Sequence, residues 1–349
     1  MISWLNHHTR PYIIAEAGVN HNGSIQHALE LIEAATDAGA DAVKFQAFSA
    51  AQLTTVTAPK ADYQRTAADN HQSQQQMLRQ LQLETDDFRK LHRHCADKGI
   101  DFMVTPFSAS WVRQLNNLPF PAWKIGSGHI GSCELLRAVG RTTRPVILST
   151  GMSEIAEVES AITTLSQAGT TQIALLHCVS LYPTQLIQVN LFAIGTLTQH
   201  FDLPTGFSDH TTDTDTGALA VAAGAQILEK HLTLDRSLPG PDHAMSLTPA
   251  QFVEYVRLAR RSAAACGRSE KRPHPDEQQM RRIARLSVVT TRTIRAGQTI
   301  SVDMLTEKRP GTGIPADRLE QLVGRVSKVD IPADHLISWD DLQPCRQTD

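Results

Sequence analysis

The chain has 349 residues, of which 41% are hydrophobic, 5% aromatic and 20% charged, and its formal net charge is −3. These proportions are those of a globular protein and exclude a disordered chain or a coiled-coil rod. Because nucleic-acid-binding proteins usually carry a basic excess and aromatic rings for base stacking, we expect no nucleic-acid partner. At about 150 residues per domain, the length predicts two domains, or one barrel with a small appendage.

Membrane insertion and export are not expected from the apolar segments of the chain. The longest nearly apolar stretch, 217–228, is too short to cross a bilayer and contains Gln226. The first residues lack the basic and apolar regions of a secretory signal. The five cysteines are scattered and form no CxxC pair: Cys95, Cys133, Cys178, Cys266 and Cys345. We therefore expect reduced thiols that fill small apolar spaces in a cytoplasmic protein.

Short β-rich runs alternate with amphipathic segments over most of the chain. The runs cover residues 12–17, 42–48, 101–107, 123–128, 146–151, 173–180, 205–211 and 227–233. Helical periodicity lies between them and is clearest over 24–39, 84–99, 154–169 and 249–267. Eight β/α units in series imply parallel strands with right-handed crossovers. No GxGxxG motif follows the first strand, so a closed (β/α)8 TIM barrel is favoured over a doubly wound open sheet.

The pattern changes after the last helical segment. Residues 267–279 are polar and contain two prolines, which is typical of a linker. We predict a barrel domain over 1–270, a linker over 271–281 and a second, mostly β domain over 282–349. This tail contains a repeat, in which six residues recur 37 positions later: Ile294, Ala296, Ile300, Ser301, Asp303 and Leu305 return as Ile331, Ala333, Ile337, Ser338, Asp340 and Leu342. The alternative to two copies of one β-rich half is chance similarity. A tail of this size has a thin core, so we expect it to pack on another surface.

Polar side chains occur at the ends of nearly all the predicted strands, where barrel enzymes carry their active sites. They are Glu16, Asn20, His21, Lys44, Gln46, Thr105, Ser108, Lys124, Ser127, Ser149, Thr150, His177, Ser180, Tyr182, Ser208, Asp209, His210, Glu229, Lys230 and His231. Lys44 and Lys124 lie in otherwise apolar runs, and lysine is rarely buried without an anionic partner. With neighbouring hydroxyls they predict a site for phosphate and carboxylate groups. An internal ion pair between Lys44 and Glu16 is the alternative.

Two histidines, His210 and His231, end consecutive predicted strands. In a barrel these ends are neighbours, so both imidazoles can reach one cation. Two histidine ligands leave coordination positions open for substrate oxygen and water, as a catalytic metal requires.

With these residues in place, the chain resembles the sialic acid synthase family, and the resemblance covers nearly its whole length. The segments that carry it are IAEAGVNHNG at 14–23, AVKFQAF at 42–48, TPFS at 105–108, KIGSG at 124–128, LSTGM at 148–152, LLHCVSLYPT at 175–184, GFSDHT at 206–211 and EKHLTLDRSLPGPDHAMSL at 229–247. In the tail, KRPGTGIP at 308–315 resembles the antifreeze-like (SAF) domain, a β-clip fold, that this family carries. Members condense phosphoenolpyruvate with an N-acylated mannosamine-type sugar.

The resemblance implies a role for each matching residue. The phosphoenolpyruvate site would consist of Lys44, Thr105, Lys124, Ser127, Ser149, Ser180 and Ser208, with Ser180 standing where many members have asparagine. His210 and His231 match the ligands of a divalent metal, usually Mn2+, with Mg2+ or Co2+ as alternatives. Glu16 matches a carboxylate that acts in acid–base chemistry.

The sugar site is implied in the same way, by Gln46, Tyr182 and Asp242. Arg309 in the tail matches an arginine that reaches the sugar site of the partner subunit, which implies a domain-swapped homodimer. His129 departs from the family, because many members have glutamate at this position. That departure leaves the phosphoenolpyruvate site intact and puts the identity of the sugar in doubt.

The predicted function is therefore that of an N-acetylneuraminate synthase, which condenses phosphoenolpyruvate with open-chain N-acetylmannosamine and releases phosphate by C–O cleavage. The implied metal polarises the sugar aldehyde. A 2,4-diacetamido-2,4,6-trideoxymannose acceptor would instead make the enzyme a legionaminate synthase, and an altrose isomer a pseudaminate synthase. Two more distant alternatives are a barrel that acts on a phosphorylated sugar and a catalytically inactive sugar-binding barrel.

Overall fold

The computed structural model describes residues 10–60, 73–267 and 269–344. The chain divides into two compact units, Met1–Gly267 and Arg268–Asp349. Each unit is described by itself below.

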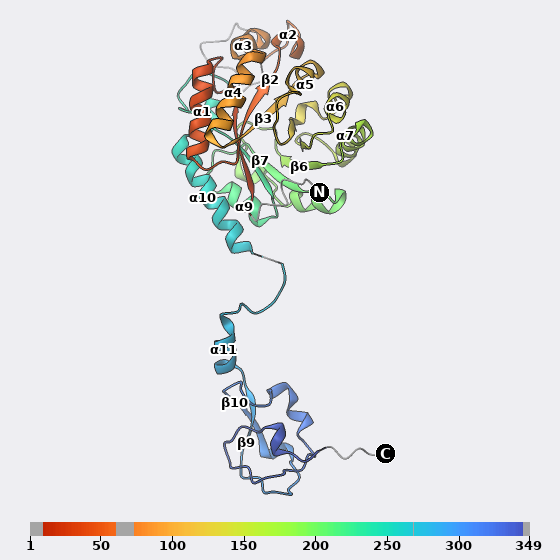
Figure 1. The fold of residues 1–349 in the computed structure, drawn as a ribbon, viewed down its shortest axis with the longest axis vertical. Helices are drawn as coiled ribbons and strands as arrows, with labels where there is room; N and C mark the ends of the chain where they lie inside the picture. The colour runs from red at the N-terminus through yellow and green to blue at the C-terminus, as the bar shows by residue number, and fades with distance from the viewer. Residues whose placement is uncertain (1–9, 61–72, 268, 345–349) are drawn as a thin grey trace. The chain divides into compact units, whose positions relative to one another are not determined.

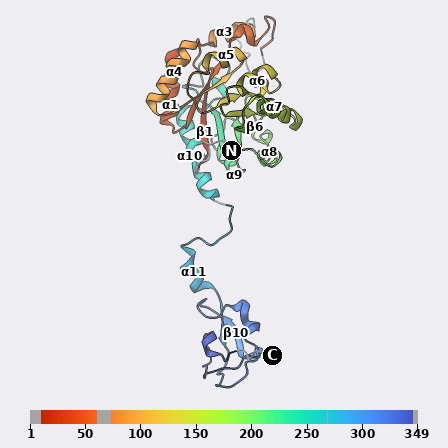
Figure 2. The same ribbon diagram turned by 45° about the vertical axis from the view of Figure 1, so that its right-hand side comes forward.

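The first unit is a closed barrel of eight parallel strands in the order β1 to β8, which confirms the predicted (β/α)8 fold (Figures 1 and 2). The strands are β1 (Tyr12–Gly18), β2 (Ala42–Ala47), β3 (Asp101–Pro106), β4 (Trp123–Ile125), β5 (Val146–Ser149), β6 (Ile173–Cys178), β7 (Thr205–Asp209) and β8 (Ile227–His231). Pairing of β1 with β8 closes the barrel and places Glu16 beside His231. On the other side, β1 pairs with β2 and places Glu16 beside Lys44.

Helices follow the strands and cover the outside of the barrel (Figure 1). They are α1 (Ile25–Asp37), α2 (Ala50–Leu53), α3 (Gln74–Leu81), α4 (Thr85–Lys98), α5 (Ala109–Leu115), α6 (Cys133–Gly140), α7 (Ile155–Ala168), α8 (Ala193–Phe201), α9 (Thr216–Ala222) and α10 (Pro249–Cys266). Local sequence sets their ends. Thr248 and Gln251 form a capping box at the start of α10, and Gly99 ends α4 in the left-handed conformation with φ of 72°.

The interior of the barrel is apolar at one end and polar at the other. Alternate residues of each strand point inward, and those nearer the strand starts form an apolar layer: Tyr12, Ile14, Ala42, Met103, Ala122, Ile147, Ala174, Leu176 and Ile227. Two positions further along the strands, the inward residues are polar: Glu16, Lys44, Thr105, Lys124, Ser149, Cys178, Ser208 and Glu229. The apolar layer therefore closes the barrel beneath a polar floor at the C-terminal ends of the strands.

The second unit is a small β-rich domain with helix α11 (Glu277–Ala284) and two antiparallel strands, β9 (Ser287–Thr290) and β10 (Leu305–Lys308). Its core consists of Val288, Ile294, Ile300, Met304, Leu305, Ile314, Leu322, Ile331, Ile337 and Leu342. The isoleucines and leucines of both sequence repeats are all in this core, whereas Ala296 and Ala333 are exposed. Ile294 and Ile331 exchange reciprocal backbone hydrogen bonds of 2.9 and 2.8 Å, as expected where two similar halves meet.

Both repeats also fold alike locally. The first contains a short 3-10 helix at Val302–Met304, and the second has one at the equivalent position, Trp339–Asp341. The predicted linker 271–281 differs from the structure at its end, because α11 begins at Glu277. Good helix formers and an acidic first turn explain this helix, whereas the prolines before it favour a linker.

Four cysteines, Cys95, Cys133, Cys178 and Cys266, are free thiols, and Cys345 lies outside the described residues. Among the described residues, no helix is long and apolar enough to span a bilayer. The cytoplasmic location stays a prediction.

Candidate active site

The floor of the barrel mouth is built around two buried lysines. Lys44 Nζ lies 2.7 Å from Glu16 Oε2 and donates to Thr105 Oγ1 at 2.7 Å. Lys124 Nζ donates to Ser149 Oγ at 2.6 Å. The ion pair considered as an alternative for Lys44 is thus present. Both lysines also line a pocket of about 860 Å³.

Glu229 was expected at a strand end but with no role in the site, and it joins the two lysines. Its carboxylate lies 3.7 Å from Lys44 Nζ and 3.6 Å from Lys124 Nζ, and it accepts a hydrogen bond from Ser208 Oγ at 3.1 Å. The signal was available, because Glu229 precedes His231 by two residues in one strand and so points into the same interior.

The charges of this floor depend on burial and on one another. Burial lowers the pKa of Lys124. Burial also opposes the charge of Lys44, but Glu16 and Glu229 outweigh it and raise the pKa of Lys44. For Glu229, Lys124 and Lys44 outweigh burial and lower its pKa, whereas burial raises the pKa of Glu16. The floor therefore combines two cations with one firmly ionised carboxylate and one carboxylate that takes up a proton more easily.

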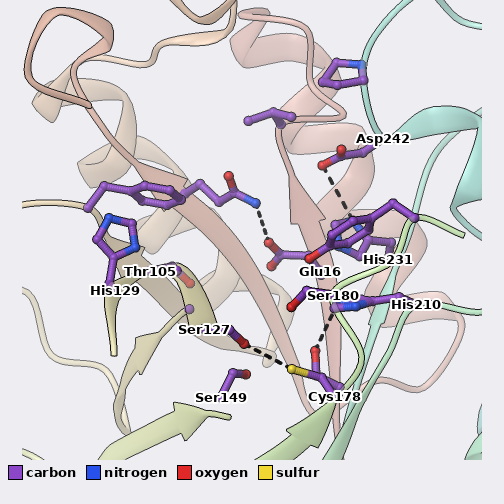
Figure 3. Close-up of a pocket in the computed structure, with 18 of the residues that line it drawn as sticks. Glu16, Thr105, Ser127, His129, Ser149, Cys178, Ser180, His210, His231 and Asp242 are labelled. Atoms are coloured by element: carbon purple, nitrogen blue, oxygen red, sulfur yellow. Dashed lines mark hydrogen bonds and ion pairs between the residues drawn. The ribbon is translucent and has the colours of Figure 1, made fainter. Parts of the chain in front are cut away.

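The predicted histidine pair lies at the rim, next to this floor (Figure 3). The ring centroids of His210 and His231 are 5.9 Å apart. His210 Nδ1 lies 2.7 Å from the carbonyl oxygen of Val179. Because a carbonyl oxygen only accepts, Nδ1 carries the proton and Nε2 keeps a lone pair. His231 Nδ1 lies 3.8 Å from Asp242 Oδ2, and the ring of Tyr182 lies 4.4 Å from that of His210.

These two imidazoles suit a metal, although they are only part of a coordination sphere. Burial lowers the pKa of both His210 and His231, so both are neutral near pH 7, as metal ligands must be. In the described part of the chain, no group of three or more His, Cys, Asp or Glu side chains is arranged to hold an ion. The donor set therefore fits a cation that takes its other ligands from substrate and water.

A small polar cradle lies where β5 and β6 end. Gly151 N donates to Ser127 Oγ at 3.0 Å, and Ser127 Oγ lies 3.1 Å from Cys178 Sγ. A Cβ atom at Gly151 would lie 2.5 Å from Ser180 Oγ and 2.8 Å from Cys178 Sγ, so only glycine leaves this space open. Cys178, predicted as a small apolar filler, is buried and also lines this pocket.

The other side of the pocket is largely apolar. We call it the apolar wall, and it consists of Leu53, Met77, Leu78, Leu81 and Phe107. His129 packs edge-on against Phe107 with ring centroids 4.7 Å apart, and burial lowers its pKa. Figure 3 shows His129 across the pocket from His210 and His231. Between these sides, Gln46 Nε2 donates to Glu16 Oε1 at 2.9 Å.

The structure brings nearly all predicted site residues to one pocket, which is lined by Glu16, Lys44, Gln46, Thr105, Lys124, Ser127, His129, Ser149, Ser180, Tyr182, Ser208, His210, His231 and Asp242. Arg309 lies in the second unit and is exposed. The functional roles implied for these residues stay predictions.

Some strand-end residues expected at the rim do not line this pocket. His177 Nε2 lies 2.8 Å from the carbonyl oxygen of Val189 and its ring stacks on Phe207, and Asp209 and Lys230 pair with each other at 3.0 Å. The physical reason is strand alternation, because the residues between two inward-pointing positions face the surrounding helices.

A closed barrel with buried lysines and neutral imidazoles at the C-terminal ends of its strands carries its polar groups where barrel enzymes have their active sites. Residues 31–271 match the NeuB family and residues 285–343 match the SAF domain. The chain therefore belongs to the NeuB family of nonulosonic acid synthases, as its resemblance predicted.

Relatives in the family match over nearly the full length. The chain is 40% identical to the N,N'-diacetyllegionaminic acid synthase of Campylobacter jejuni, over 93% of this chain and 98% of that protein. It is 39% identical to the enzyme of the same name from Legionella pneumophila, over 95% and 94%. A crystal structure of N-acetylneuraminic acid synthetase from Leptospira borgpetersenii is 33% identical, with a TM-score of 0.70, and the match covers 78% of this chain and 90% of that one.

Proposed function

We propose that this protein is a phosphoenolpyruvate-dependent nonulosonic acid synthase. It condenses phosphoenolpyruvate with an open-chain N-acylated amino sugar and releases phosphate by C–O cleavage. The observation that carries the proposal is the pair of buried lysines, Lys44 and Lys124, at the floor of one pocket with His210 and His231 at its rim. An anion with both phosphate and carboxylate groups is the ligand that suits two cations held in this way.

Phosphoenolpyruvate binds on the polar floor in this proposal. Lys44 and Lys124 offset its charge and orient its C3 for attack on the sugar aldehyde. Hydroxyl groups complete the site, namely those of Thr105, Ser127, Ser149, Ser180 and Ser208. Ser180 donates over a shorter reach than asparagine, and the small Gly151 next to it keeps the cradle open for a phosphate oxygen.

Glu16 handles protons at the sugar. Burial raises the pKa of its carboxyl group, and the contacts with Gln46 and Lys44 fix its position. A carboxyl group whose pKa is raised takes up a proton more readily than an ordinary glutamate, as a group that both donates and accepts protons must. Glu16 would open the sugar ring or activate the water that adds at C2 of the donor.

His210 and His231 would hold a divalent cation, with Mn2+ proposed first and Mg2+ or Co2+ as alternatives. When bound, the cation supplies Lewis-acid polarisation of the sugar carbonyl. The chain's own contribution is to keep both imidazoles neutral by burial and to fix the tautomer of His210 through Val179.

For the acceptor, we propose a 2,4-diacetamido-2,4,6-trideoxy sugar, so that the product is a legionaminic acid. Two relatives of 39–40% identity carry this activity in their names. The apolar wall and the neutral His129 also suit a 6-methyl group better than a hydroxymethyl group. N-acetylmannosamine, the acceptor predicted from sequence, is the second candidate and is supported by the 33% identical synthetase structure.

The test is a phosphate-release assay with phosphoenolpyruvate and Mn2+, run side by side with the 6-deoxy diacetamido sugar and N-acetylmannosamine. We expect a higher kcat/KM for the 6-deoxy sugar. In His129→Glu, which restores a polar group at the sugar end, we expect this preference to decrease. Equal turnover of both sugars would contradict the proposed acceptor. Absence of phosphate release with either sugar, and with the altrose isomer, would indicate a catalytically inactive barrel.

Arg309 and the domain-swapped homodimer belong to the same proposal. If Arg309 of one subunit completes the sugar site of the other, Arg309→Ala raises KM for the sugar and leaves KM for phosphoenolpyruvate unchanged. An equal effect on both substrates would contradict this assignment. Sedimentation equilibrium of the full chain measures the dimer directly.

A further inference from the structure

A buried ion pair lies directly behind the two rim imidazoles. Lys230 Nζ is 3.0 Å from Asp209 Oδ2, and their side chains are 1% and 0% exposed. Asp209 ends β7 directly before His210, and Lys230 precedes His231 on β8. The two residues are direct cross-strand partners in the barrel register.

This placement joins the backbones of both histidines through one interaction. Because side chains alternate across a strand, Asp209 and Lys230 face the helices while His210 and His231 face the pocket. A displacement of β7 relative to β8 that moved one imidazole would therefore separate the buried charges behind it.

Thr211 extends the connection to the residue that follows His210. Its backbone N–H donates to Asp209 Oδ1 at 2.9 Å. Its carbonyl oxygen and its Oγ1 accept hydrogen bonds from Lys230 Nζ at 2.6 and 3.0 Å. The residues on both sides of His210 are thus bound to the same ammonium group.

The layer behind the pair is equally constrained. The ring of Tyr255 on α10 lies with its centroid 5.5 Å from Lys230 Nζ. Gly217 on α9 leaves room for this ring, since a Cβ atom there would lie 2.4 Å from it. Lys230 is therefore enclosed by a strand, a turn and an aromatic ring.

Burying two charges costs desolvation energy that an apolar pair would avoid, so stability alone does not explain their presence. We propose that Asp209 and Lys230 are positioning residues that hold His210 and His231 at the spacing a divalent cation requires. The inference rests on the metal site of the proposed function. It differs from that proposal because it concerns the position of the imidazoles, which is measurable without metal.

The test uses the full chain with Asp209→Asn, Lys230→Met and the double variant. The double variant removes both charges and leaves no lone buried charge, so it keeps the test decisive if a single variant does not fold. The matched control is Asp41→Asn. Asp41 accepts from Ile13 N at 2.9 Å and pairs with Arg260 at 3.3 Å at the opposite end of the strands.

Two measurements are made on each folded variant. The first is the imidazole 15N spectrum of the metal-free protein, with His210 and His231 signals assigned by their substitution with glutamine. The second is calorimetric titration with Mn2+ and, separately, with phosphoenolpyruvate. Thermal unfolding reports the stability that each variant loses.

We expect both imidazole signals to shift or broaden in the Asp209 and Lys230 variants and to stay unchanged in Asp41→Asn. The Kd for Mn2+ should rise by about 10- to 100-fold, as for other residues behind a metal ligand, with a much smaller change for phosphoenolpyruvate. Unchanged imidazole signals in the folded double variant would overturn the inference, and so would equal losses of affinity for Mn2+ and phosphoenolpyruvate. Failure of the unsubstituted protein to bind Mn2+ would contradict the proposed metal site, and the spectra would still decide the positioning role.

Discussion

Substitution of Lys124 by methionine tests the anion site most directly. Methionine has nearly the same length as lysine but no charge, so it fills the same space in the barrel interior. In this variant Glu229 still has its ion pair with Lys44 at 3.7 Å and its hydrogen bond from the hydroxyl of Ser208 at 3.1 Å. Lys124→Met therefore leaves no isolated buried charge. We therefore expect the variant to fold.

The distance of a carboxylate already present in the site sets the scale of the effect. Glu229 Oε1 lies 3.6 Å from Lys124 Nζ. At an effective dielectric constant of about 20, two unit charges at this separation attract each other by about 4.6 kcal/mol. This energy is an upper limit for the attraction between Lys124 and one substrate oxygen in a similar position. Loss of one buried, hydrogen-bonded charge contact costs about 2–4 kcal/mol, so affinity for phosphoenolpyruvate should fall by roughly 30- to 900-fold.

Calorimetric titration with phosphoenolpyruvate measures this loss without turnover, and the phosphate-release assay measures kcat and KM. The matched control is Lys98→Met, because Lys98 pairs with Glu33 on the exposed surface at 2.8 Å. Exposed pairs contribute little, so the control should bind phosphoenolpyruvate normally. If folded Lys124→Met bound phosphoenolpyruvate with an affinity within about threefold of the unsubstituted protein, the loss would be less than about 0.7 kcal/mol. That result would refute the anion site.

Two other perturbations follow from the same contacts and from helix packing. Burial lowers the pKa of Lys124, and the negative charge of Glu229 opposes that decrease. In Glu229→Gln the pKa of Lys124 should therefore fall further, and the alkaline limb of the pH profile of kcat/KM for phosphoenolpyruvate should move to lower pH. An alkaline limb at unchanged pH would contradict the role of Lys124. Gly140→Ala places a Cβ atom 2.5 Å from Cβ of Ala168, between α6 and α7. It should lower the free energy of unfolding, measured by urea denaturation, by about 1–3 kcal/mol. In Gly195→Ala, within α8, the new Cβ atom meets no atom within 4 Å, and the free energy of unfolding should rise by about 0.5–1 kcal/mol. Destabilisation of similar size in both variants would argue against the packing explanation.

Much of the fold was accessible from the sequence because its signals are local. Alternation of β-rich runs and amphipathic segments predicted each barrel strand within a few residues, and the repeat in the tail corresponds to two halves that fold alike. The start of α11 at Glu277 was missed because prolines in the preceding segment masked a short helix with no buried face. Its apolar side rests mainly on Met280 and Ile283, which is a weak periodic signal in a segment of only eight residues.

The site was predicted less completely, for a reason that Glu229, Asp209 and Lys230 illustrate. All three are charged residues at strand ends, and sequence alone treated them alike. Strand alternation places Glu229 in the pocket between two lysines and turns Asp209 and Lys230 toward the helices, where they pair with each other. Which charges meet depends on register between strands, and register is a property of the closed sheet.

The sequence by itself determined the barrel class, the family and the residue types available at the rim, because these depend on periodicity and on ordered motifs along the chain. Only the tertiary structure decided the electrostatic state of the site. Lys44 and Lys124 share one carboxylate, both imidazoles are neutral, and an apolar wall stands opposite them. Burial and distance between residues far apart in the chain set these properties, and no local pattern contains that information.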